Sequence, residues 1–254
     1  MNAVKVRNIE IGGGVPKICV PIVGKTKKDI LGDAENVCKL KTDVAEWRGD
    51  WYEDILDSAG LETTLSELRK VLGDTPLLFT FRTSKEGGEM AIDTENYVKL
   101  NQKVIRTGIA DMIDVELNRG EEAVESIINT AHMYGVKVIA SNHDFQRTPD
   151  KDEMVSRLCR MQKQGADIAK IAVMPKNKAD VLALLAATEE MTAHHGDTPV
   201  VTMSMSGTGV ISRVCGEVFG SALTFGAAGR ASAPGQMKVG ELRTILELLH
   251  KSMQ

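Results

Sequence analysis

The sequence predicts a (β/α)8 (TIM) barrel, and three observations support this prediction. The chain has 254 residues, which is close to the roughly 250 residues typical of such barrels. Short apolar runs alternate with segments of helical spacing along almost the whole chain. No long linker interrupts this alternation, so we expect one domain over residues 1–254. An open doubly wound sheet is the alternative fold, but the nucleotide-binding motif that usually accompanies it is absent.

The predicted strands are short apolar runs, as expected for parallel strands that are buried on both faces. In chain order they are 18–23, 44–47, 77–81, 112–117, 136–140, 168–173, 200–205 and 222–225. Pro76 and Pro199 open two of these strands, where a missing N–H does least harm. Residues 3–11 precede the first strand and alternate polar with apolar side chains. We expect them to form a short hairpin or arm that covers the bottom of the barrel.

The segments between the strands carry apolar stripes at helical spacing. The clearest stripes are Met154, Val155, Leu158 and Met161, then Val181, Leu184, Leu185 and Thr188, and finally Leu242, Ile245, Leu246 and Leu249. Thr64-Leu65-Ser66-Glu67 fits the pattern of a capping box at the start of a helix. Thr148-Pro149 fits an N-cap followed by a proline in the first turn.

The composition narrows the class of function. The formal net charge of -4 argues against a general nucleic-acid-binding protein, and no apolar run is long enough to span a membrane. The amino-terminal segment lacks the apolar core of a signal peptide. Gly24-Lys25-Thr26 resembles the end of a P-loop, but Cys19 stands where that motif needs glycine. The cysteines lie far apart without a Cys-x-x-Cys pair, so we expect no zinc site, reduced thiols and a cytoplasmic location.

Polar side chains gather at the carboxyl ends of the predicted strands, where barrel enzymes hold their catalytic groups. Side chains two residues apart on a strand face the same side. By this rule the strand ends present Glu46 and Arg48, Thr80 and Arg82, Asp114 and Glu116, Ser141 and His143, Lys170, and Met203 and Met205, with Arg213 a few residues beyond. We therefore expect the active site at this end of the barrel.

Lys170 stands out because it lies inside an apolar strand, where a lysine is rare unless it is paired or functional. Burial disfavours the ammonium and favours the free amine, which can attack a carbonyl. The alternatives are a snorkelling or salt-bridged lysine, or one on the outer face. His143, on the neighbouring strand, could act as a general acid and base, or be a structural histidine beside Asp144. Glu86 by itself would be read as a solvated charge.

Arg48, Arg82 and Arg213 place positive charge at the mouth of an acidic protein. A guanidinium binds a carboxylate through two parallel hydrogen bonds, so these arginines indicate a small anionic substrate. Surface salt bridges to Glu46 or Glu116 could explain two of them. The Gly-, Ala- and Ser-rich residues 226–236 are typical of a lid, with Ser232 and Gln236 as polar contacts, or of an ordinary flexible loop.

At these positions the sequence resembles the type I 3-dehydroquinate dehydratases, from Lys17 to His250. The resemblance rests on several motifs that occur together and in order. They are Glu46-Trp47-Arg48, Leu78-Phe79-Thr80-Phe81-Arg82 with Lys85-Glu86-Gly87-Gly88, Ser141-Asn142-His143-Asp144-Phe145, the run from Gly165 to Pro175, Met203-Ser204-Met205, Gly209-Val210-Ile211-Ser212-Arg213, and Ala231-Ser232-Ala233-Pro234-Gly235-Gln236. Pro21 departs from the family, where a small hydroxylated residue is familiar, so we assign it no polar role.

The resemblance implies a barrel that removes water from 3-dehydroquinate to give 3-dehydroshikimate, in the shikimate pathway of aromatic amino-acid biosynthesis or in quinate breakdown. It implies that Lys170 forms an imine (Schiff base) with the substrate ketone. It also implies that His143 takes the C2 proton and returns one to the departing C1 hydroxyl, and that Glu86 orients His143.

The same resemblance implies the residues that bind the substrate. Arg213 would hold the carboxylate with Ser232 and Gln236, Glu46, Arg48 and Arg82 would meet the ring hydroxyls, and Met203, Met205 and Phe225 would form an apolar wall. It implies no metal or organic cofactor and a homodimer.

Three other functions remain to be weighed. A class I aldolase is also a barrel with a Schiff-base lysine, but such enzymes usually bind phosphate through glycine-rich loops after the seventh and eighth strands. A catalytically inactive barrel retained as a binding protein is a second alternative. A metal-dependent lyase that uses His143, Asp144 and Glu116 is the third.

Overall fold

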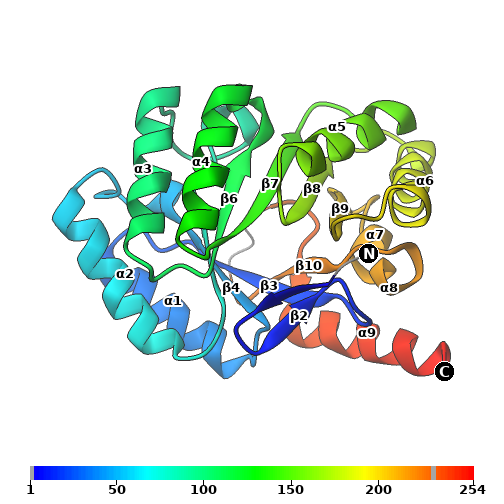
Figure 1. The fold of residues 1–254 in the computed structure, drawn as a ribbon. Helices are drawn as coiled ribbons and strands as arrows, with labels where there is room; N and C mark the ends of the chain where they lie inside the picture. Colours follow the sequence, from blue (N-terminus) through cyan, green and yellow to red (C-terminus); the bar gives the residue numbers. More distant parts are fainter. Residues whose placement is uncertain (1–2, 230–232) are drawn as a thin grey trace.

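The predicted barrel strands form one curled sheet, in which each strand is parallel to its neighbours (Figure 1). This computed structural model describes residues 3–229 and 233–254. The strands run in the order β10-β3-β4-β5-β6-β7-β8-β9. They are β3 (Lys17–Ile22), β4 (Val44–Arg48), β5 (Leu77–Thr80), β6 (Met112–Glu116), β7 (Lys137–Asp144), β8 (Ile168–Val173), β9 (Val200–Ser204) and β10 (Leu223–Ala227). The prediction of a (β/α)8 barrel is confirmed.

The barrel closes between β9 and β10 through a short contact. Val200 forms an isolated parallel bridge with Ser221, just before β10, and its carbonyl accepts a hydrogen bond from the Ala222 N–H at 2.8 Å. The Ser221 hydroxyl accepts a further bond from the Thr202 N–H at 3.0 Å. The Ser221 hydroxyl thus replaces a backbone carbonyl as hydrogen-bond acceptor where the two strands meet.

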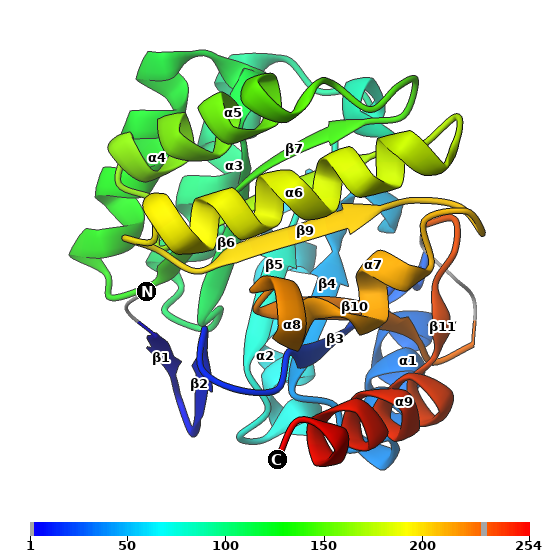
Figure 2. The same ribbon diagram turned by 90° about the vertical axis from the view of Figure 1, so that its right-hand side faces the viewer.

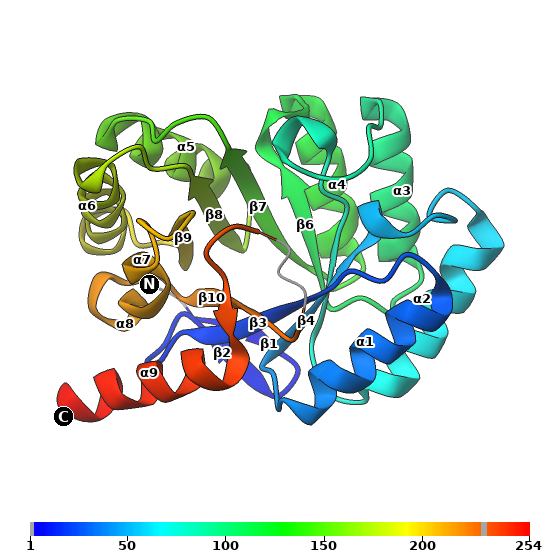
Figure 3. The same ribbon diagram turned by 180° about the vertical axis from the view of Figure 1, so that it is seen from behind.

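Helices alternate with the strands and cover the outside of the barrel (Figures 1 and 2). They are α1 (Lys27–Lys39), α2 (Ser58–Leu72), α3 (Thr94–Arg106), α4 (Glu121–Met133), α5 (Lys151–Lys163), α6 (Lys178–His194), α7 (Ile211–Val214), α8 (Gly216–Phe219) and α9 (Val239–Ser252). Two short helices follow β9, and α9 follows β11 (Met237–Lys238) and packs against β3 and β10 (Figure 3). Of the helices described, none is long and apolar enough to cross a membrane.

The apolar stripes predict the buried faces of the helices correctly, but two predicted helix starts are wrong. Thr64 lies buried inside α2, which begins after Asp57, whose side chain accepts from the Gly60 N–H. Helix α5 begins after Asp150 rather than Thr148. The Thr148 hydroxyl instead donates to the Met174 carbonyl at 3.1 Å. In both cases an aspartate near the expected start satisfies the free N–H groups of the first turn.

Strand β7 extends well beyond its predicted end. We expected it to stop at residue 140, but it continues through Ser141, Asn142 and His143 to Asp144. The apolar pattern stops at Ala140 because the following interior side chains belong to a polar site rather than to the core. The other strands match their expected ranges to within two residues.

The amino-terminal residues form the expected hairpin, with β1 (Val4–Val6) antiparallel to β2 (Ile9–Ile11). Val6 and Ile11 are buried against apolar side chains from the beginnings of the barrel strands. Arg7 Nε donates to Asp111 Oδ1 at 2.6 Å, and Asp111 directly precedes β6. The hairpin therefore covers the amino-terminal end of the barrel, which confirms the prediction.

The barrel interior changes from apolar to polar along the strands. On β6 the buried Met112 belongs to the apolar interior cluster, whereas Asp114 and Glu116 further along are charged and also buried. On β8, Ile168 belongs to the same cluster, and Lys170 follows two residues later. The apolar half stabilises the barrel, and the polar half leaves charged groups buried at the carboxyl end.

Candidate active site

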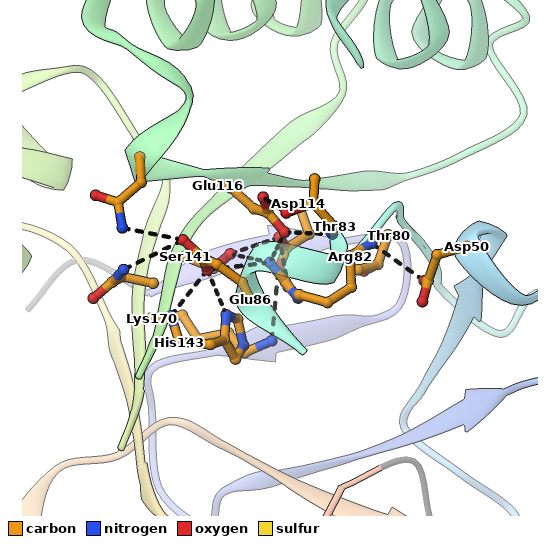
Figure 4. Close-up of polar contacts among 12 residues, drawn as sticks. Asp50, Thr80, Arg82, Thr83, Glu86, Asp114, Glu116, Ser141, His143 and Lys170 are labelled. Atoms are coloured by element: carbon orange, nitrogen blue, oxygen red, sulfur yellow. Dashed lines mark hydrogen bonds and ion pairs between the residues drawn. The ribbon is translucent and has the colours of Figure 1, made fainter. Parts of the chain in front are cut away.

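The side chain of Lys170 lies inside the barrel and belongs to a buried polar cluster (Figure 4). Only 4% of the residue is exposed. Its Nζ lies 3.4 Å from Asp114 Oδ2 and 4.6 Å from the centroid of the Phe225 ring. The lysine therefore neither reaches solvent nor packs on the outer face, and it forms a buried ion pair.

His143 and Glu86 form a second buried pair on the same side of the pocket. His143 lies on β7 opposite Ala172 of β8, and Glu86 ends the 3-10 turn Ser84–Glu86. Glu86 Oε2 lies 3.0 Å from His143 Nδ1 and accepts from the His143 backbone N–H at 2.9 Å. Since an ionised carboxylate only accepts hydrogen bonds, it favours the tautomer with the proton on Nδ1. Nε2 of His143 is then free to act as a base.

Burial governs the protonation of this pair. It lowers the pKa of His143 well below the ordinary value, and the positive charges of Arg82 and Lys170 lower it further. Burial raises the pKa of Glu86, while the charge of Arg82 opposes this rise. His143 is consequently neutral at pH 7, the form that a general base requires.

Arg82 is surrounded by carboxylates (Figure 4). Its Nη2 lies 2.8 Å from Asp114 Oδ1, and its Nη1 lies 3.0 Å from both Glu116 Oε1 and Ser141 Oγ. Ser141 Oγ in turn donates to Asp114 Oδ1 at 2.6 Å. The salt bridge to Glu116 that we considered from the sequence is therefore present, with Arg82 as the partner, but it is buried rather than on the surface.

Arg48 also has an acidic partner, although not the one considered from the sequence. Its Nε and Nη2 donate to the two oxygens of Asp50 at 2.8 and 2.7 Å. Glu46 accepts instead from the Thr80 hydroxyl at 2.8 Å. The salt bridge between Arg48 and Glu46 that we considered is therefore replaced by a buried pair with Asp50.

Arg213 differs from the other two arginines because no carboxylate pairs with it in the part of the chain that the structure describes. It lies in α7 and is 1% exposed. Its Nη2 donates to the Pro234 carbonyl at 2.9 Å, and its Nη1 lies 3.9 Å from Met203 Sδ. Burial alone lowers the pKa of Arg213 to about 10. A buried cation without an anion is costly, and an anionic ligand would relieve that cost.

These groups surround a pocket of about 480 Å³ at the carboxyl end of the barrel. Most of the predicted site residues line it, namely Glu46, Arg48, Arg82, Glu86, His143, Lys170, Met203, Met205, Phe225 and Gln236. Arg213 contacts Met203 but does not itself line the pocket, and Ser232 lies outside the described residues. Over residues 3–229 and 233–254, no group of three or more His, Cys, Asp or Glu is arranged to hold a metal ion.

Four polar residues of the cluster were assigned no part in the expected dehydratase site. Asp114, Glu116 and Ser141 stand at predicted strand ends, so strand alternation found their location but not their partners. Asp50 was not singled out, although it continues the alternation of Glu46 and Arg48. A polar residue at every second position past a strand end is the signal that could have found it.

The fold and this cluster define a class of protein, the barrel enzymes with a buried strand lysine that faces a pocket at the carboxyl end of the barrel. Within that class the chain belongs to the type I 3-dehydroquinase family, whose model matches residues 18–253.

Relatives of known structure and sequence agree with this assignment. The 3-dehydroquinate dehydratase of Clostridioides difficile (strain 630) is 56% identical over 98% of each chain, and that of Listeria welshimeri is 57% identical over 99% of each. A crystal structure of the type I enzyme from Clostridium difficile, with covalently modified comenic acid, has a TM-score of 0.97 at 55% identity and covers 99% of each chain. The enzyme from Geobacillus kaustophilus also has a TM-score of 0.97, at 39% identity, over 100% of this chain and 98% of its own.

Proposed function

We propose that this chain dehydrates 3-dehydroquinate to 3-dehydroshikimate through an imine on Lys170, with His143 as the general acid and base. Family membership supports the reaction, and relatives over 50% identical along nearly their whole length are 3-dehydroquinate dehydratases. The observation that carries the mechanism is the buried Lys170 amine, which faces the same pocket as the neutral His143.

The imine step begins when the Lys170 amine attacks the ketone carbon of the substrate and water leaves. The protonated imine then withdraws electrons from the ring, which makes the neighbouring C–H acidic. Asp114 lies close enough to stabilise the iminium that replaces the ammonium of Lys170. The covalently modified ligand in the Clostridium difficile relative supports a covalent chemistry for the family pocket.

The elimination needs one proton removed and one returned. Neutral His143 would accept the C2 proton on Nε2, giving an enamine and an imidazolium. The imidazolium would then donate its proton to the C1 hydroxyl as that group leaves as water. Glu86 holds Nδ1–H and offsets the positive charge of the imidazolium while it exists. Hydrolysis of the imine restores Lys170, so the net change is the loss of one water.

One binding role follows from charge, since no described carboxylate pairs with the buried Arg213. We propose that Arg213 binds the substrate carboxylate, with Gln236 and Ser232 beside it. Glu46, Arg48 and Arg82 would meet the ring hydroxyls, and Met203, Met205 and Phe225 would form the apolar wall.

Reduction with borohydride in the presence of 3-dehydroquinate tests the substrate, the mechanism and the residue together. Reduction of the imine should leave Lys170 heavier by the mass of the ligand less one oxygen atom, located by peptide mass spectrometry. Lys170→Ala should show neither the adduct nor turnover in an ultraviolet assay for the conjugated product. Lys137→Ala is the matched control, because Lys137 lies at the start of β7 and pairs with Asp167. An adduct that persists in Lys170→Ala contradicts the mechanism.

The remaining proposals are a single catalytic domain, a homodimer, and a cytoplasmic enzyme of the shikimate pathway. The helices and strands described all belong to the barrel sheet, the helices around it or the amino-terminal hairpin, which supports one domain. Light scattering of the purified chain tests the dimer. Incubation with sugar phosphates tests the aldolase alternative, since any cleavage product contradicts the dehydratase assignment.

A further inference from the structure

Asp50 has an unusual set of partners for a carboxylate that does not line the pocket. It lies in the 3-10 turn Gly49–Trp51, directly after β4, and is 1% exposed. Oδ1 accepts from Arg48 Nε at 2.8 Å and from the Arg82 backbone N–H at 3.2 Å. Oδ2 accepts from Arg48 Nη2 at 2.7 Å and from the Glu89 backbone N–H at 3.1 Å. Every group that faces these oxygens is a donor.

The turn can place Asp50 this deep because it begins with glycine. A Cβ at position 49 would lie 2.8 Å from the ring of Phe79, which is fully buried on the next strand. Glycine therefore allows the chain to turn inwards directly after Arg48. The carboxylate of Asp50 reaches the loop that follows β5 as a result (Figure 4).

That loop, residues 82–89, carries Glu86, and we call it the Glu86 loop. Asp50 holds both of its ends, through the backbone N–H groups of Arg82 and Glu89. Glu116 holds it at Thr83, whose N–H and hydroxyl both donate to that carboxylate at 2.8 Å. The loop's own backbone contacts are one 3-10 turn, a bond from the Gly88 N–H to the Thr83 carbonyl, and a bond from the Ser84 N–H to the Met90 carbonyl just beyond it. The two carboxylates add the bonds that tie the loop to the ends of β4 and β6 and so help to fix where Glu86 lies.

Asp50 also fixes Arg48 on the other side of the pocket. Two of the three guanidinium nitrogens bond to Asp50, which leaves Nη1 without a hydrogen-bond partner among the described residues. A bidentate pair holds a guanidinium in one plane, so it also decides where the remaining nitrogen points. Arg48 and Glu86 both line the pocket. The Asp50 carboxylate binds the guanidinium of Arg48 and also both ends of the Glu86 loop.

We infer that Asp50 is a positioning residue that sets the distance between Arg48 on the binding side and Glu86 on the proton-transfer side of the pocket. The inference rests on the proposed function, since it assigns these two sides their roles.

Asp50→Asn tests this inference with almost no change in shape. In either orientation of the new amide, its NH2 group faces two donors that lose their acceptor. These donors are Arg48 Nη2 and the Glu89 N–H in one orientation, and Arg48 Nε and the Arg82 N–H in the other. We expect kcat/KM for 3-dehydroquinate to fall about 100-fold, as for a misplacement of about 1 Å at a catalytic site. Both parameters should change, with KM rising through Arg48 and kcat falling through Glu86. The acid side of the pH profile of kcat should move, because His143 loses its aligned partner.

Asp111→Asn is the matched control. Asp111 accepts from Arg7, from Arg69 and from the Leu77 N–H, but at the opposite end of the barrel. Its variant should lower the Tm while kcat, KM and the pH profile stay at the wild-type values. Thr83→Val separates the two sides, since it removes one bond from the Glu86 loop and leaves Arg48 held. We expect it to lower kcat and to leave KM unchanged.

Asp50→Ala covers the case in which the asparagine variant does not fold. It introduces no misplaced donor, and water can enter the vacated polar space and accept from the four donors. The inference is overturned if a folded Asp50 variant keeps wild-type kcat, KM and pH profile, as Asp111→Asn should. It is also overturned if Asp50→Ala fails to fold, because Asp50 then serves stability. A wild-type protein without turnover would instead contradict the proposed function.

Discussion

Replacing Arg213 by methionine should make the protein more stable and a worse enzyme. Arg213 is buried, and no described carboxylate pairs with it. Methionine has a similar length and no charge, so Arg213→Met keeps most of the packing and removes the cation. The change therefore separates the stability cost of the charge from its proposed use in binding the substrate.

The size of the effect follows from the pKa of the guanidinium. Burial lowers the pKa of Arg213 to about 10, against a reference value of about 12.5. A lowered pKa on a cation means that the folded state holds the proton less tightly than the unfolded state does. The charge then costs roughly 3 to 4 kcal/mol of folding free energy, in full at any pH below about 10.

Arginine also donates to the Pro234 carbonyl, a bond worth roughly 1 to 2 kcal/mol. The net gain for Arg213→Met is then about 2 kcal/mol. For a chain of this size that raises the Tm by about 4 to 8 °C. KM for 3-dehydroquinate should rise about 100-fold or more, because a charge-assisted pair with the carboxylate is lost.

Thermal unfolding followed by circular dichroism at pH 7, together with steady-state kinetics, measures both effects. Arg69→Met is the control, because Arg69 is also partly buried but pairs with Asp111 at 2.6 Å. Burial lowers the pKa of Arg69 as well, but Arg69 also donates to the carbonyls of Gly73, Thr75 and Ile109. Removing it loses these bonds together with the ion pair, so this variant should lose stability and keep its KM. The reasoning is refuted if Arg213→Met loses as much stability as Arg69→Met, or if its KM for 3-dehydroquinate equals that of the wild type.

Two further predictions concern His143. His143→Ala should still form the borohydride-trapped adduct, because the Lys170 amine remains. It should lower kcat by at least about 100-fold, because the proton carrier is lost. Equal loss of adduct and turnover would mean that His143 is needed for imine formation itself. Burial and nearby cations hold the pKa of His143 well below its ordinary value, whereas burial raises the pKa of Glu86 to about 7. The acid-side decline of kcat/KM should therefore be centred near 7 and report protonation of Glu86, and a profile that stays level well below pH 7 would contradict the need for an ionised Glu86 beside a neutral His143.

The fold could be predicted well because its signals are local. Parallel strands buried on both faces appear as continuous apolar runs, and the intervening stripes mark the helices. The errors lie where the local signal has another cause. Ser141 and His143 interrupt the apolar run of β7 because they face the site, and Thr64 has the pattern of a cap while it lies buried inside α2.

The candidate site could be predicted by position but not by pairing. Strand alternation placed Asp114, Ser141 and Lys170 at one end of the barrel, as the structure has them. Their hydrogen bonds join residues on different strands, such as Lys170 and Asp114, which are 56 positions apart in the sequence. No local sequence pattern predicts which acidic side chain pairs with which basic side chain. Glu86 was assigned a role only through the family resemblance, because a loop glutamate has no periodic signal.

Pairing also changes the argument for an anionic substrate. From the sequence we treated Arg48, Arg82 and Arg213 as three equivalent positive charges. In the structure Arg48 pairs with Asp50, and Arg82 pairs with the buried Asp114 and Glu116. A carboxylate ligand gains little from a guanidinium whose charge is already balanced, and much from one that burial has left uncompensated. Arg213 lies beyond β9 and Lys170 lies on the neighbouring strand β8, so the ligand carboxylate would point past the end of β9 while its ketone faces β8. The charges that the protein leaves unpaired, rather than their number, therefore set the orientation that the proposed reaction requires.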